Sequence, residues 1–161
     1  MADPKPIAGA RALLFERLVD LHPGSLDEVQ RPFRILNREQ LKASVRRELE
    51  RLLNTRCSLP LHVLGETERS VINYGIPDFS SLSAHNADDH ALIVSIITQT
   101  ISAFEPRLRQ VHVAVEQIEA SESSLMVNIN AELVVDLFNE PVSFPVLLNS
   151  KTGAAEVNDI Q

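Results

Sequence analysis

The sequence predicts an α+β fold in which two to three helices pack on one face of a mainly antiparallel sheet that ends in a C-terminal β-hairpin. Apolar residues recur with helical spacing along 37–53 and 88–104, whereas a period of two dominates after residue 108. The chain has 161 residues, of which 44% are hydrophobic, and this is enough for one core. We therefore expect an arm with a short helix and a connector at 1–35, followed by a single α+β domain at 36–161.

The N-terminal part predicts a short helix between two irregular stretches. Residues 1–9 contain Pro, Ala and Gly, which indicates a loose arm. The helix that follows should end at a His-Pro-Gly triplet, 22–24, before a polar connector at 25–35. Its apolar face is formed by Leu14, Leu18 and Leu21.

The second helix is well marked. Asn37 is a good N-cap, and Gln40 stands where a capping box needs its second residue. Arg47 and Arg51 lie opposite the apolar stripe with Glu48 and Glu50 nearby, which is typical of a solvated, ion-paired face rather than a phosphate site. The stripe itself consists of Leu41, Val45, Leu49, Leu52 and Leu53.

After this helix, Asn54, Thr55 and Arg56 offer polar groups that can close the last helical carbonyls. The segment 57–86 then shows no clear periodicity. Irregular segments of this length inside a compact domain are uncommon and are often functional.

The most informative feature is the junction between the third helix and the first strand of the sheet. The stretch 88–104 is apolar around most of its circumference, which predicts a buried central helix. Pro106 should end it, because proline lacks an N–H and disfavours the α conformation at Glu105. An acid and a guanidinium, Glu105 and Arg107, then flank a rigid corner. They indicate either an internal ion pair that pins the junction or a docking or catalytic carboxylate.

Three further strands should complete the sheet. Strand 109–118 pairs through the turn 120–124 with strand 125–137, whose apolar and polar residues alternate between two faces. A third strand at 142–148 turns at 149–153 into a short fourth at 154–157. Pro141 and Pro145 place this last hairpin at an edge of the sheet.

Composition argues against several function classes. The net charge is −7 and there is no Trp, so the chain would be repelled by a phosphate backbone and has little to stack on bases. A single cysteine, Cys57, excludes an internal disulfide and suits a reducing compartment. No apolar run reaches transmembrane length, so we expect a soluble, cytoplasmic protein without direct membrane insertion.

Catalytic and cofactor signals are weak. No two glycines stand close together, so a phosphate-binding loop is not indicated, and there is no GxSxG motif. His85 and His90, with Asp88 and Asp89 between them, are spaced so that a helix would not place both histidines on one face. We therefore expect no metal, no cofactor and no catalytic residue.

A glycosidase would need two carboxylates across a sugar-sized cleft, one of them a general acid. Glu105 could supply one carboxylate. A neighbouring guanidinium at Arg107 would favour the charged form, which is the wrong state for a general acid.

Three phrases, taken together, resemble one family. They are the Arg-Arg-Glu-Leu-Glu-Arg-Leu-Leu-Asn-Thr-Arg run at 46–56, the Val-Ile-Asn-Tyr-Gly-Ile-Pro-Asp-Phe run at 71–79, and the Phe-Glu-Pro-Arg-Leu run at 104–108. In this order and spacing they are similar to TssE, the baseplate component of bacterial type VI secretion systems, which is related to the small wedge protein of contractile-phage baseplates. The resemblance covers about 11–157.

The resemblance implies a structural, non-catalytic role in which 36–161 is a baseplate wedge domain. Its implied partners are the baseplate subunits TssF, TssG and TssK and the sheath subunits TssB and TssC, whose polymerisation it helps to initiate. It also implies assembly at the cytoplasmic side of the inner-membrane secretion complex. The family's Glu-Pro-Arg motif matches Glu105, Pro106 and Arg107, which are the implied partner-binding residues.

We further hypothesise that the hairpin 142–157, together with this corner, presents the first docking surface for sheath, because an exposed sheet edge is a template for another strand. The segment 57–86 and the first helix are candidate contacts with wedge subunits.

Two alternatives stay open. The first is a peptidoglycan hydrolase, because the family has carried a lysozyme-like label. The second is a soluble regulatory adaptor on the same fold.

Overall fold

The computed structural model describes residues 10–18, 35–63, 67–83, 86–116, 124–135, 138–149 and 152–158. Several expectations therefore lie outside the described residues: the arm at 1–9, Leu21 and the triplet at 22–24, most of the connector, His85, and most of the turn at 120–124.

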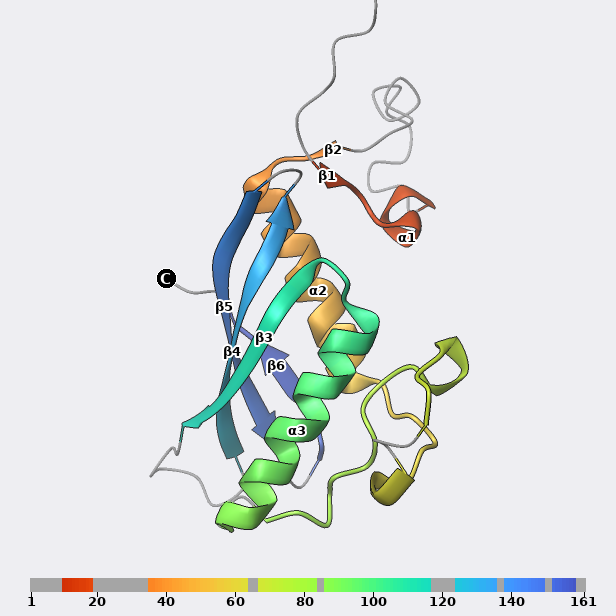
Figure 1. Ribbon diagram of the computed structural model, residues 1–161, viewed down its shortest axis with the longest axis vertical. Helices are drawn as coiled ribbons and strands as arrows, with labels where there is room; N and C mark the ends of the chain where they lie inside the picture. Colours follow the sequence, from red (N-terminus) through yellow and green to blue (C-terminus); the bar gives the residue numbers. More distant parts are fainter. Residues whose placement is uncertain are drawn as a thin grey trace, which may run out of the picture.

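The predicted α+β architecture is confirmed. Four antiparallel strands lie in the order β3-β4-β5-β6: β3 Leu108–Glu116, β4 Ser124–Val135, β5 Phe138–Asn149 and β6 Ala155–Val157. Figure 1 shows the two long helices, α2 (Arg38–Asn54) and α3 (Ala87–Phe104), on the same side of this sheet. A separate two-stranded pair, β1 (Ala10–Arg11) with β2 (Ile35–Leu36), ties the N-terminal segment to the start of α2.

Helix α2 begins and ends as its sequence predicts. The Asn37 side chain accepts from the amide of Gln40, and the Gln40 side chain accepts from the amide of Asn37, so the capping box is complete. The apolar stripe is buried throughout its length, and one polar residue, Ser44, is buried with it.

Helix α3 is less deeply buried than its composition predicts. Asn86 caps it, and Asp88 and Asp89 lie in its first turn, where the positive end of the helix dipole stabilises their negative charges. Ala91 and Leu92 are exposed, whereas the buried face holds Ile93, Ile96, Ile97, Thr100 and Ile101. The expectation of a helix buried all round is therefore wrong: α3 lies on the outside of one sheet layer, and only one face meets the core.

The alternation of β4 is confirmed, and its inward side chains from Leu125 to Leu133 are buried. Strand β5 is longer than predicted because it pairs with β4 along its whole length, from Phe138 to Asn149. Strand β6 pairs with β5 only from Val146 to Leu148, so in the described sheet no strand pairs with the outer edge of the earlier part of β5. Pro141 lies in that open stretch, as expected for a proline at a sheet edge.

The residues that leave α2 clamp the C-terminal hairpin. The Asn54 side-chain amide donates to the carbonyl of Ala155 over 2.7 Å, and its oxygen accepts from the amide of Ala155 over 3.0 Å. Arg56 donates to the carbonyls of Leu53 and Gly153. Gly153 has φ +69°, a conformation that favours glycine, and a Cβ there would also displace the Arg56 guanidinium.

The segment between α2 and α3 contains two short 3₁₀ turns, η1 (Leu61–Val63) and η2 (Val71–Asn73), in its described part. Its beginning is joined to a later part by a parallel bridge between Arg56 and Ile76. Ile76 and Phe79 are buried in the main core, so this irregular segment is packed on the domain.

Candidate functional site: the Glu105–Pro106–Arg107 corner

The corner is a tight turn between α3 and β3. Glu105 leaves the helical conformation, with φ −119° and ψ 80°, and its carbonyl accepts from the amide of Leu108 over 3.1 Å. Pro106 therefore stands at the second position of a β-turn, which its fixed φ favours, and its ring is exposed. The predicted end of the helix at Pro106 is confirmed.

Glu105 and Arg107 form an internal, two-point ion pair. Arg107 Nε donates to Glu105 Oε1 over 2.8 Å, and Nη2 donates to Oε2 over 2.7 Å. The backbone amide of Arg107 adds a third contact to Oε1 at 3.2 Å. Glu105 is only 4% exposed. The structure thus realises the first of the two interpretations of this motif, since both charges are satisfied within the chain.

The pair continues into α2 and the N-terminal helix α1 (Leu14–Leu18). Arg107 Nη1 donates to the hydroxyl of Ser44 over 2.8 Å, and that hydroxyl donates to Glu16 Oε2 over 2.9 Å. Arg47 donates to Glu16 Oε1 over 2.6 Å. Burial by itself raises the pKa of Glu16, but the hydrogen bonds from Arg47, Ser44 and the backbone of Leu13, together with the charge of Arg47, outweigh it, so the pKa of Glu16 is lowered.

Aromatic side chains lie on the other side of the corner. Tyr74 meets Phe104 edge to face with 5.1 Å between ring centroids, and the Arg69 guanidinium lies 4.9 Å from the centre of the Phe104 ring. Burial raises the pKa of Tyr74, and the carboxylates of Glu48 and Glu105 raise it further. The second resemblance phrase, 71–79, is therefore packed directly against the third.

That same loop holds two aliphatic side chains in solvent. Val71 and Ile72 are 88% and 91% exposed. The loop beneath them is well braced: the Asn73 side chain accepts from the amide of Ser70, and Arg69 donates to the carbonyl of Gly75 over 2.6 Å. An apolar pair on a firmly held turn is a feature of interaction surfaces.

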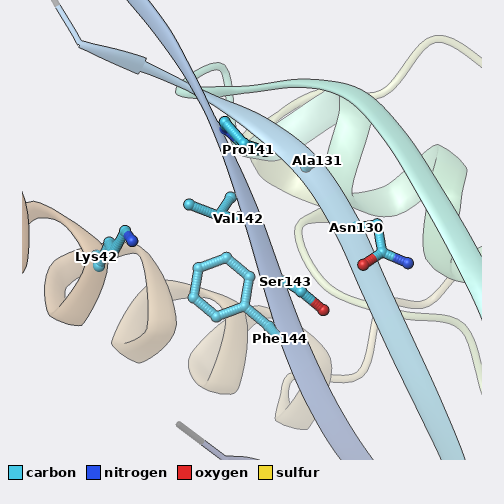
Figure 2. A pocket seen from close by; sticks show the side chains of 7 residues that line it. All are labelled: Lys42, Asn130, Ala131, Pro141, Val142, Ser143 and Phe144. Carbon is cyan, nitrogen blue, oxygen red and sulfur yellow. The ribbon is translucent and has the colours of Figure 1, made fainter. Parts of the chain in front are cut away.

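A groove of about 400 Å³ lies between α2 and the open stretch of β5. Figure 2 shows Lys42 on α2 facing this strand, with Val142 and Phe144 projecting toward the helix. Its lining is Lys42, Asn130, Ala131, Pro141, Val142, Ser143 and Phe144. This lining contains no carboxylate, so the groove lacks the paired acids that a glycosidase requires.

Within the described ranges, no cluster of three or more His, Cys, Asp or Glu side chains is placed to hold a metal ion. In that same part of the chain, no helix combines the length and the apolar character needed to cross a bilayer.

Sequence reasoning located the corner but missed Ser44 and Glu16. Ser44 had a usable signal, because it follows Leu41 by three residues and so falls on the apolar stripe of its helix. Glu16 had none, since a lone acid on a short helix is most often solvated. Arg51 does pair with Glu48 on its own helix as expected, whereas Arg47 reaches across to α1.

The corner, α3 and most of α2 lie in a region of the chain that matches a known family. The family model described as "GPW_gp25: Baseplate wedge protein gp25" matches residues 39–136, more than half of the chain, including α2 except its first residue, α3 and the corner. The chain belongs to this family. It is accordingly a structural baseplate subunit, and the resemblance to baseplate wedge proteins is confirmed.

Among solved structures, a chain of "The baseplate complex from the type VI secretion system" is similar, with 19% identity and a TM-score of 0.49. The similarity covers 68% of this chain and 94% of that chain. No curated protein matches the sequence.

Proposed function

We propose that this chain is the TssE-type wedge subunit of a type VI secretion baseplate. In this proposal, residues 36–161 form the wedge domain and residues 1–35 an N-terminal arm. The baseplate partners are TssF, TssG and TssK, and the domain helps to start polymerisation of the TssB–TssC sheath on the cytoplasmic side of the membrane complex. The observation that carries the proposal is the intact Glu105–Pro106–Arg107 corner, which lies inside the matched family region.

The corner acts in docking through its shape. Because Glu105 and Arg107 satisfy each other, neither charge is free to pair with a partner without breaking the buried contact. Pro106 is the exposed member of the motif and the part that a partner would touch. The ion pair then holds the turn in one conformation, which lowers the entropy lost on binding.

The second docking element is the open edge of β5. The amide of Asn158 donates to the carbonyl of Pro145, so the odd-numbered residues of β5 direct their backbone groups toward the outer edge. Pro141 and Pro145 have no N–H there, which leaves Ser143 as the donor between them. A sheath strand added here would pair in a register that uses the amide of Ser143.

Contacts with other wedge subunits involve the exposed Val71 and Ile72. A neighbouring baseplate subunit with an apolar pocket would bury both side chains. The turn lies against Phe104 through Tyr74 and Arg69, so this surface is continuous with the corner.

The subunit is non-catalytic in this proposal. Glu105 is locked to Arg107 on both carboxylate oxygens, which leaves it unsuited to give up a proton to a leaving group.

The decisive experiment is co-purification of the chain with wedge subunits, followed by sheath assembly in their presence. The variants are Glu105→Ala, Arg107→Ala, Pro106→Ala, and the double charge reversal Glu105→Arg with Arg107→Glu. Ser95→Ala on the outer side of α3 serves as the control. We expect wedge binding by every folded variant and loss of sheath assembly in the corner variants.

Two results would count against the proposal. Sheath assembly unaffected in folded Glu105→Ala, Arg107→Ala and Pro106→Ala alike would remove the corner from docking. Folded wild-type protein that binds none of these subunits would overturn the scaffold role, and a glycan-cleavage assay would then test the hydrolase alternative.

The double variant Val71→Ser with Ile72→Ser should weaken wedge binding without unfolding the domain.

A further inference from the structure

A single hydroxyl joins the corner to the N-terminal segment. The Ser44 hydroxyl accepts from Arg107 Nη1 over 2.8 Å and donates to Glu16 Oε2 over 2.9 Å. One O–H group can do both at once, so it links a guanidinium on one side with a carboxylate on the other. Ser44 is fully buried, so water does not compete for these bonds.

The resulting hydrogen-bond network alternates positive and negative side chains and connects α1, α2 and the corner. Arg47 on α2 pairs with Glu16 on α1, and Glu16 meets Arg107 through Ser44. Arg107 is therefore shared between two carboxylates, directly with Glu105 and indirectly with Glu16. With its N–H groups directed to different partners, the guanidinium plane is held at fixed points, which restricts the turn that carries Pro106.

Among the described side chains of α1, Glu16 makes the polar contact with the domain. Leu14 and Leu18 stand on the same face of α1 but are 67% and 74% exposed, so neither contributes much apolar contact to the domain. Glu16 instead turns inward, toward Ser44 and Arg47. Ala12 and the β1–β2 pair anchor the chain just before the helix. The described side chains of α1 thus make their strongest contact with the domain through the same carboxylate that reaches the corner.

We propose that Glu16 is a positioning residue for the Glu105–Pro106–Arg107 corner, and that it acts through the hydroxyl of Ser44. The N-terminal segment is then a brace that sets the orientation of Arg107 when the corner docks. This inference rests on the proposed docking role of the corner. It differs from a purely structural role, because the loss of the brace should weaken docking more than it weakens folding.

The first test needs no partner. We would follow the Arg107 Nε–H signal by NMR, with its hydrogen exchange rate, in wild type, Ser44→Ala and Glu16→Gln. Ser44→Ala removes the relay but leaves both ion pairs, and Glu16→Gln keeps an acceptor for Ser44 while it loses the charge. We expect the Arg107 signal to shift and exchange to speed up in Ser44→Ala, with a smaller change in Glu16→Gln.

Matched controls are available on the same fold. Ser95→Ala removes a serine that accepts from Gln99 on α3, and Glu48→Gln breaks the ion pair with Arg51 on α2. Neither side chain is bonded to the corner, so neither change should alter the Arg107 signal. An Arg107 signal identical in wild type, Ser44→Ala and Glu16→Gln would overturn the brace.

The second test measures affinity for the wedge subunits and sheath assembly. We expect Ser44→Ala to weaken docking about tenfold, the size of a typical coupling between residues in one network, when measured on protein that circular dichroism shows to be fully folded. Docking equal to wild type in both Ser44→Ala and Glu16→Gln would refute the brace while leaving the corner's role intact. Wild type that fails to bind any subunit would instead refute the proposed function, and the NMR result would still decide whether Glu16 positions Arg107.

Discussion

At the scale of single residues, the corner shows that charged residues in a motif can hold the fold together instead of contacting a partner. Glu105 and Arg107 look like a pair of recognition charges in the sequence, but the fold buries them against each other. A buried pair adds little net stability when it is complete, since desolvation offsets much of the attraction. Losing one partner is costly, because the other charge stays behind without compensation.

We therefore expect Glu105→Gln to destabilise the domain by about 3 kcal/mol, because it leaves the Arg107 guanidinium without its carboxylate. Urea unfolding followed by circular dichroism measures this. Glu48→Gln is the matched comparison, since it breaks an exposed pair on α2 and should cost less than about 1 kcal/mol. Equal losses in the two variants would mean that the Glu105 pair is effectively solvated.

At the scale of elements, the end of α2 and the C-terminal hairpin act as one unit. The Asn54 side chain presents an N–H and an oxygen to the backbone of Ala155, as a residue in a neighbouring strand would. It thereby satisfies the outward backbone groups of Ala155 in β6. The same amide also donates to the carbonyl of Glu50 in the last turn of the helix. The Leu-Leu-Asn-Thr-Arg phrase is thus explained as a joint between a helix end and a short strand.

Asn54→Ala should cost about 2 kcal/mol, since it removes two bonds to the backbone of β6 and one to the helix end. Amide exchange at Ala155 should accelerate more than exchange within β4, because β6 has only three residues and is held on its outer side by this side chain. Asn128→Ala is a suitable control, as it removes an exposed bond to Glu116 on the sheet. Unchanged protection at Ala155 would contradict the clamp.

At the scale of the whole molecule, two carboxylates add polar contacts between α2 and the elements beside it. Glu16 ties α1 to α2, and Glu140 on β5 pairs with Arg38 and Lys42 on α2. Hydrogen bonds from Arg38 and Lys42 lower the pKa of Glu140, and the pKa of Glu16 is lowered as well. The assembly of the outer elements on the core is therefore sensitive to acid.

Both groups have folded-state pKa values below the ordinary glutamate value of 4.5. Their contribution to stability is therefore complete above that value and disappears as the pH falls through the lowered pKa values. We expect unfolding midpoints to be flat near neutral pH and to fall below about pH 4.5. Glu16→Gln should lower the neutral midpoint and make the acid decline shallower; a decline as steep as in wild type would show that Glu16 does not contribute.

The sequence by itself determined the helices, the four strands of the main sheet and their order, but not the short β1–β2 pair. These follow from local chemistry that needs no distant partner: the Asn37 cap, the ring of Pro106, and the alternation from Leu125 to Leu133. The fold class followed, because alternating strands after two helices leave one apolar face to be covered. The three phrases by themselves also carried the resemblance to the baseplate wedge family.

Only the tertiary structure decided which distant side chains bind to the corner. Ser44 lies 63 residues from Arg107, and Glu16 lies 28 residues from Ser44, so no spacing rule could join them. The exposed side of α3 and the reach of Asn54 to β6 were likewise invisible. Periodicity reports which face of an element is apolar, whereas the partners of a polar group depend on how elements far apart in the chain are brought together by packing.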